Sequence, residues 1–148
     1  MTFVAPMLGV QEDTFDWDNL PIEEFDTIYQ IKWDGVRCIA HILNGKASLY
    51  NRSGKSLTDT FPEIVGALER SSTLRTGEYI FDGEVVCFDE ARDSIKFALN
   101  RCQISSKLKA ELAAKKNPAR FFVFDVISSP GTNINTPYAV RYGLLENL

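Results

Sequence analysis

Two turn dipeptides constrain the fold of this chain more than any other feature. Asp34-Gly35 and Asn44-Gly45 are both flanked by apolar or β-branched residues. That pattern is typical of hairpins closed by a two-residue loop. The two dipeptides therefore predict a meander of antiparallel strands over residues 27–33, 36–43 and 46–52.

The rest of the chain alternates further strands with helices. Thr58 or Asp59 can cap a helix that has Pro62 in its first turn, and Thr136 with Pro137 can start the last helix. The predicted class is α+β, a mainly antiparallel sheet with flanking helices. The remaining elements are strands over residues 79–88, interrupted at 82–84, and 120–127, and helices over 94–103 and 105–116.

Lys32 stands at the end of the first predicted strand, where alternation places it on the same face as Gln30. With Asp34-Gly35 as the loop, Lys32 would lie opposite Arg37, with Cβ atoms roughly 5 Å apart. A guanidinium that close disfavours the protonated amine, and the neutral amine is the nucleophilic form. This spacing predicts an activated lysine. The plainer reading, a solvated lysine at a strand end, stays open from the hairpin alone.

Composition excludes several classes of function. The chain has 148 residues, the length of one domain, and a net charge of -4, which is not that of a generic nucleic-acid coat. Three widely spaced cysteines and a single histidine form no zinc pattern. No signal peptide or membrane span is evident, and a reducing cytoplasm is the expected compartment.

Several segments together resemble one enzyme family. Lys-x-Asp-Gly-x-Arg at 32–37 is similar to the nucleotidyl-lysine motif of ATP-dependent DNA ligases, RNA ligases and mRNA capping enzymes. The other segments follow in the order of the DNA ligase adenylation domain, and the short, repair-associated bacterial ligases are the most similar. These segments are Pro6-Met7-Leu8, residues 51–55 with 61–63, residues 81–86, residues 122–126 and the closing helix 137–148.

The resemblance implies a reaction and a catalytic residue. Lys32 would attack the α-phosphate of ATP, giving lysyl-AMP and pyrophosphate, and AMP would then pass to the 5′-phosphate of nicked double-stranded DNA. Mg²⁺ would assist, through ligands that the sequence leaves unknown. Asp34 and Gly35 would support the lysine by shaping its turn.

The same resemblance assigns a nucleotide-binding set. Gln30 would read the adenine edge, Glu84 would accept a hydrogen bond from a ribose hydroxyl, and Phe124 would stack on the base. Judged locally, a core role for Phe124 and a strand-end role for Arg52 are open alternatives. The complete set is Gln30, Ile31, Arg37, Arg52, Glu84 and Phe124.

The resemblance covers only the beginning of the family's pattern. No segment is similar to the later Glu-Gly and Lys-x-Lys strands or to the OB-fold, so residues 1–148 resemble the N-terminal part of an incomplete, ATP-grasp-like nucleotidyltransferase domain. Without those lysines and metal ligands, slow or absent nick sealing is expected from this chain alone. An open sheet edge would favour self-association or a partner that supplies the missing strands.

Two other functions fit the same residues. An RNA ligase or capping guanylyltransferase would use the same lysine chemistry on a different substrate. A non-catalytic nucleotide- or DNA-binding fragment would bind ATP reversibly without a covalent adduct.

Overall fold

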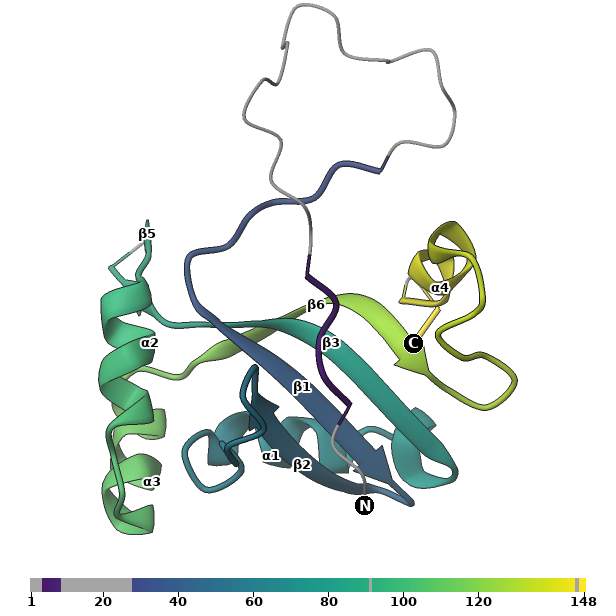
Figure 1. Ribbon diagram of the computed structural model, residues 1–148. Helices are drawn as coiled ribbons and strands as arrows, with labels where there is room; N and C mark the ends of the chain where they lie inside the picture. Colours follow the sequence, from purple (N-terminus) through teal and green to yellow (C-terminus); the bar gives the residue numbers. More distant parts are fainter. Residues whose placement is uncertain (1–3, 9–27, 91, 146) are drawn as a thin grey trace, which may run out of the picture.

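A computed structural model describes residues 4–8, 28–90, 92–145 and 147–148. In the described part of the chain, an antiparallel sheet of four strands has the order β2-β1-β3-β6 (Figure 1). Its strands are β1 (Val36–Leu43), β2 (Lys46–Asn51), β3 (Glu78–Val86) and β6 (Arg120–Ser128). The remaining elements are α1 (Pro62–Arg70), the 3₁₀ turn η2 (Thr73–Arg75), the small hairpin β4 (Phe88–Asp89) and β5 (Arg92–Asp93), α2 (Ile95–Cys102), α3 (Lys107–Lys116) and α4 (Tyr138–Leu145).

The β1–β2 hairpin forms where the second dipeptide predicts it. Asn44 and Gly45 have φ angles of 49° and 77°, the left-handed conformations that a tight hairpin loop requires. Pairing runs from Leu43 with Lys46 to Cys38 with Asn51. The predicted α+β class with an antiparallel sheet is confirmed.

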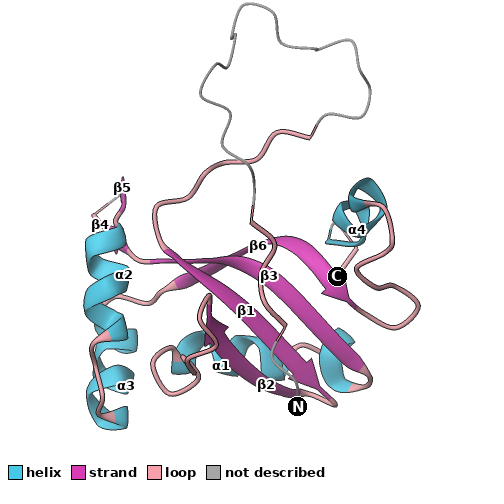
Figure 2. Cartoon of the chain, viewed as in Figure 1, coloured by secondary structure: helices cyan, strands magenta, loops and turns pink. Residues whose placement is uncertain are grey.

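The sheet has one apolar face and one mixed face. Cys38, Ala40 and Ile42 of β1 belong to the main core, which α1 covers (Figure 2). Intervening residues point to the opposite face, where Ile39 joins a small apolar cluster with Ile80, Ile127 and Val4. The N-terminal segment 4–8 crosses the sheet on that second face (Figure 1). The polar groups of the second face form the candidate site.

The predicted first strand is wrong. Residues 28–33 form no strand, and residue 27 lies outside the described residues. β1 pairs with β2 on one side and with β3 on the other, so no position remains for a partner that folds back at Asp34-Gly35.

Two smaller expectations also need correction. Thr58 and Asp59 do not cap α1, because the helix begins at Pro62 with Phe61 as its N-cap. Thr58 instead accepts a hydrogen bond from the Leu49 N–H at 3.0 Å. The strand around Asp82 is continuous, with a register shift at Gly83 where the Phe122 carbonyl leaves no room for a Cβ atom.

Among the described helices, none has the length and apolar character needed to cross a membrane.

Candidate functional site

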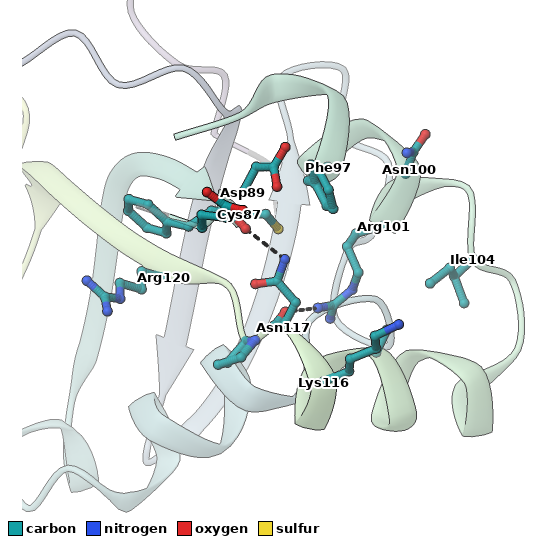
Figure 3. A pocket seen from close by; sticks show the side chains of 13 residues that line it. Cys87, Asp89, Phe97, Asn100, Arg101, Ile104, Lys116, Asn117 and Arg120 are labelled. Atoms are coloured by element: carbon teal, nitrogen blue, oxygen red, sulfur yellow. Dashed lines mark hydrogen bonds between the residues drawn. The ribbon is translucent and has the colours of Figure 1, made fainter. Parts of the chain in front are cut away.

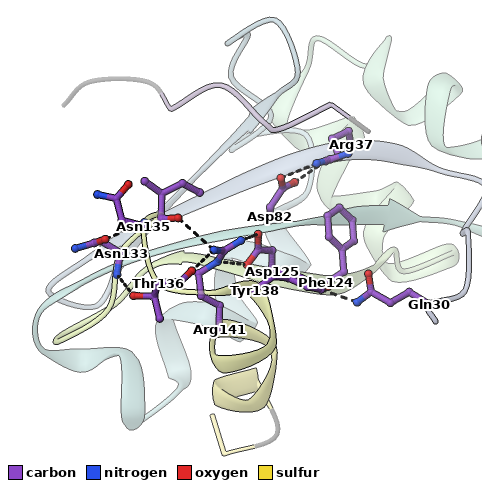
Figure 4. Close-up of polar contacts among 11 residues, drawn as sticks. Gln30, Arg37, Asp82, Phe124, Asp125, Asn133, Asn135, Thr136, Tyr138 and Arg141 are labelled. Atoms are coloured by element: carbon purple, nitrogen blue, oxygen red, sulfur yellow. Dashed lines mark hydrogen bonds and ion pairs between the residues drawn. The ribbon is translucent and has the colours of Figure 1, made fainter. Parts of the chain in front are cut away.

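A buried ion pair lies at the centre of the second face. Arg37 donates from Nε to Asp82 Oδ1 at 2.6 Å and from Nη2 to Asp82 Oδ2 at 2.7 Å (Figure 4). Its guanidinium also lies over the Phe124 ring, 4.6 Å from the centroid, and reaches the Met7 carbonyl at 3.0 Å. The hydrogen bonds to Asp82 raise the pKa of Arg37 above its ordinary value. Arg37 is therefore a permanent cation, held in one place.

This position of Arg37 overturns the expected activation of Lys32. The residue paired with Arg37 is Glu84 of β3, not Lys32. The Arg37 guanidinium instead binds the Asp82 carboxylate, which is 1% exposed and needs a neighbouring cation to stay ionised. The proposed hairpin opposition of Lys32 and Arg37 is wrong.

A second ion pair holds α4 against the sheet. Arg141 donates to Asp125 through Nε and Nη2, both at 2.8 Å, and both side chains are buried (Figure 4). Asp125 is paired with Asp82 across the β3–β6 ladder. Two carboxylates are thus adjacent, and each has its own arginine.

Glu84 provides the titratable group of the site. It lies on β3 beside the Arg37–Asp82 pair and is half-buried. Burial raises the pKa of Glu84 to about 7, although the charges of Arg37 and Lys32 oppose the rise. Among the charges that act on Glu84, those of Arg37 and Lys32 are the cationic ones.

Lys32 itself lies in an exposed loop fixed by its neighbour. The Trp33 N–H donates to the Ile31 carbonyl at 3.2 Å, a tight turn centred on Lys32. The Trp33 ring stacks on Phe122, with centroids 3.9 Å apart and planes at 17°. This stacking anchors the loop to β6 and leaves the lysine amine accessible.

Asp34 and Gly35 support the loop, although not by forming a hairpin. The Asp34 carboxylate accepts a hydrogen bond from the Ile95 N–H of α2 at 3.3 Å, and the Asp34 N–H donates to Asp93 at 2.9 Å. At Gly35, a Cβ atom would lie 2.3 Å from the Val85 carbonyl oxygen. Glycine is required here for close approach to β3, and no positive φ is involved.

A pocket of about 340 Å³ lies between the Lys32 loop and β6. Gln30 and Phe124 line it, and Gln30 Nε2 donates to the Phe124 carbonyl at 3.3 Å. The other lining residues are Tyr29, Ile31, Trp33, Phe122, Val123 and Tyr142. Arg52 lies outside the pocket, in the exposed turn after β2. Arg52 follows Asn51, which pairs with Cys38, so Arg52 lies at the end of the sheet from which Arg37 projects.

Sequence reasoning missed three contributors to this site. Trp33 stood in the motif without a role, although an aromatic residue beside an exposed lysine can anchor a loop. Arg141 and Tyr138 of α4 carried no signal, because a helix far along the chain reveals its target only after folding. Their partners, Asp125 and Phe124, belong to the strand that the sequence predicts over residues 120–127.

A larger cavity of about 820 Å³ lies apart from these residues, between α2 and α3 (Figure 3). Arg101 is buried at its edge and bonds Glu63 at 2.9 Å, the Thr60 carbonyl at 2.9 Å and the Asn117 carbonyl at 3.2 Å. Asn117 in turn donates to the Phe88 carbonyl at 2.9 Å. These bonds join α1, α2, the end of α3 and β4, which is a structural role.

Comparison with known proteins shows the family to which this chain belongs. Residues 6–148 match the family described as ATP dependent DNA ligase domain, and the chain belongs to that family. The DNA ligase of Thermoplasma volcanium is 30% identical over 122 residues, which is 81% of this chain and 20% of that protein. DNA ligase B of Mycobacterium tuberculosis is 27% identical over 146 residues, 98% of this chain and 28% of that protein.

A solved structure extends the likeness to three dimensions. A mycobacterial DNA ligase D complexed with ATP and MES superposes with a TM-score of 0.60 at 26% identity. The aligned region covers 78% of this chain and 34% of that one. This chain is therefore homologous to the adenylation domain of ATP-dependent DNA ligases and spans a fifth to a third of the length of these relatives.

Proposed function

We propose that this chain provides the nucleotide-binding and nucleophilic residues of an ATP-dependent DNA ligase. The Lys32 amine attacks the α-phosphorus of ATP; an N–P bond forms, the bond to pyrophosphate breaks, and the amine loses a proton. The observation that supports the proposal is the pairing of Arg37 with Glu84 on neighbouring strands, together with a Lys32 charge that acts on the pKa of Glu84. An exposed amine beside a carboxylate and a fixed cation can approach a bound phosphate.

Each neighbouring side chain has a role that its surroundings permit. Arg37 is held by Asp82 and presents a fixed positive charge to the ribose or the phosphate. Glu84 accepts a hydrogen bond from a ribose hydroxyl when it is ionised. Phe124 offers an aromatic face to the base in the pocket that it shares with Gln30 and Ile31. Arg52 meets the AMP phosphate from the turn after β2.

Mg²⁺ fits this site as a partner of the triphosphate. No group of three or more His, Cys, Asp or Glu residues suited to a metal occurs within the described ranges. Mg²⁺ commonly binds one or two carboxylates together with substrate phosphates, so a protein cage is not required. Glu84, the half-buried carboxylate paired with Arg37, would be the protein ligand. When bound, the ion would neutralise charge that develops on the departing pyrophosphate.

In the complete ligase, AMP would then pass from Lys32 to the 5′-phosphate at a nick in double-stranded DNA. A nucleotide test separates a capping guanylyltransferase from the DNA and RNA ligases, because the capping enzyme would transfer GMP.

Intact mass spectrometry after incubation with ATP and MgCl₂ tests the proposal. One AMP adduct is expected, slowly formed, and peptide mapping should place it on Lys32. Lys32→Ala should abolish it, while Lys46→Ala, which changes an exposed lysine on β2, should not. An adduct on another lysine, or one that persists in Lys32→Ala, would contradict the assignment; GMP transfer from GTP in preference to ATP would favour a capping enzyme.

A further inference from the structure

The Gln30 amide is held by two groups on the protein. Gln30 Nε2 donates to the Phe124 carbonyl at 3.3 Å, and the Tyr138 hydroxyl donates to the same carbonyl at 2.8 Å (Figure 4). Burial raises the pKa of the Tyr138 phenol, and a hydrogen bond with the Gln30 side chain counters that rise. Gln30 and Tyr138 thus donate to one shared acceptor, the Phe124 carbonyl, which places the amide and the hydroxyl side by side.

The polarity of this network is fixed by its carbonyl. A carbonyl oxygen only accepts, so the single hydroxyl proton of Tyr138 points to Phe124. The Tyr138 oxygen is then left as an acceptor, so the Gln30 amide pairs favourably with both neighbours only when it presents Nε2 to them. Its Oε1 atom, an acceptor, is the group that remains for a ligand in the pocket that Gln30 lines.

The orientation of the Gln30 amide matters because a side-chain amide can rotate by half a turn and exchange its oxygen with its nitrogen. A carboxylate at position 30 would be an acceptor in either orientation, whereas glutamine exchanges a donor for an acceptor when it flips. Gln30 is exposed, so packing does not prevent the flip. The Phe124 carbonyl and the Tyr138 oxygen oppose the flip, because a flipped amide would turn Oε1 towards two acceptors.

We propose that Tyr138 is a positioning residue that makes Gln30 an acceptor for the nucleobase, so that the site selects adenine over guanine. The inference rests on the proposed function, since it takes Gln30 to face the base. The 6-amino group of adenine donates to Oε1. The 6-carbonyl group of guanine would place two acceptors against each other, which leaves a polar group unpaired.

Equilibrium binding of ATP, GTP and inosine triphosphate to the intact chain tests the role of Tyr138. Wild type should favour ATP, and Tyr138→Phe should lower the ratio of ATP to GTP affinity about fivefold, the size of one ordinary hydrogen bond. Inosine triphosphate has the C6 carbonyl without a 2-amino group, so it should follow GTP. Thermal unfolding confirms that each variant is folded.

Tyr79→Phe is the matched control. It also removes one tyrosine hydroxyl bonded to a carbonyl, that of Thr73 at 3.2 Å, on the apolar face of the sheet. Its ATP to GTP ratio should equal that of wild type. In a Gln30→Met background the preference should be lost, and adding Tyr138→Phe should change the ratio no further.

The outcomes separate this inference from the proposed function. An unchanged ratio in Tyr138→Phe, an equal loss in Tyr79→Phe, inosine triphosphate binding as tightly as ATP, or binding of none of these nucleotides would overturn the role of Tyr138. AMP transfer to Lys32 is measured independently by mass. A chain that discriminates through Tyr138 but never forms the adduct would refute the proposed function alone.

Discussion

Asp82 lies directly across the β3–β6 ladder from Asp125, so two buried carboxylates are neighbours on the face that carries the candidate site. Like charges this close disfavour ionisation unless cations compensate. Arg37 compensates from β1 and Arg141 from α4. The row of four charges links the helix at the end of the chain to the strand that follows Lys32. Stability and site geometry therefore depend on the same residues.

Removing Arg141 is expected to cost far more stability than removing a surface cation. Arg141→Met leaves the Asp125 carboxylate buried without its partner, and urea unfolding should show a loss of about 3 kcal/mol. Lys46→Met breaks an exposed pair with Glu69 at 3.8 Å and should cost about 0.5 kcal/mol or less. Adding Asp125→Asn to Arg141→Met should recover part of the loss. Equal effects of the two single variants would contradict the role of the buried pair.

Glu84 is expected to make the free energy of unfolding depend on pH below neutrality. Its pKa is raised to about 7 in the folded chain, chiefly by burial, against an ordinary value of 4.5. Between these values the folded state binds more protons than the unfolded state, so the Glu84 contribution to stability falls as pH rises from 4.5 to 7. Above the folded pKa the destabilisation is constant.

The measurement is urea unfolding of wild type and Glu84→Gln at several pH values. Glutamine has no charge to bury, so Glu84→Gln should gain stability relative to wild type as the pH rises towards 7, with a plateau above. Glu69→Gln, which changes a carboxylate on α1, is the control and should follow the wild-type pH dependence. A difference between Glu84→Gln and wild type that does not change with pH would show that Glu84 titrates normally.

Much of this fold follows from local sequence signals, because the elements concerned are stabilised locally. Asn44-Gly45 specifies a tight loop by its own φ preferences, and Pro62 begins a helix at its first turn. Dense runs of β-branched and aromatic residues similarly predict β3 and β6. These elements require no knowledge of their partners.

The Lys32 loop could not be predicted in the same way, because distant residues determine its path. Alternation over residues 28–33 imitates a strand, but Trp33 packs on Phe122 and Gln30 bonds the Phe124 carbonyl. Asp34-Gly35 has the sequence of a hairpin loop but does not form one. Asp34 instead binds the start of α2, and Gly35 permits close contact with β3. The resemblance to ligases identified candidate residues here, while the local geometry drawn from the sequence was wrong.

Gly35 is expected to tolerate no side chain. In Gly35→Ala, the new Cβ atom would overlap the Val85 carbonyl oxygen, so the Lys32 loop would be displaced from β3. We expect a stability loss of about 1–3 kcal/mol and at least a tenfold slower formation of the Lys32 adduct. Gly143→Ala in α4 meets no atom within 4 Å. It should stabilise by about 0.5–1 kcal/mol through helix propensity. Similar behaviour of the two variants would refute the steric argument.

Asp34 is expected to couple the Lys32 loop to α2 through its side-chain oxygen. Asp34→Ala removes the acceptor of the Ile95 N–H and should cost about 1 kcal/mol, the usual effect of losing a helix cap. Hydrogen exchange should accelerate at the first amides of α2, and the Lys32 adduct should form more slowly. Asp34→Asn retains an oxygen acceptor and should retain the stability. Asp59→Ala, on the exposed loop before α1, should change none of these quantities. If Asp34→Asn lost as much stability as Asp34→Ala, the charge rather than the hydrogen bond would join the loop to the helix.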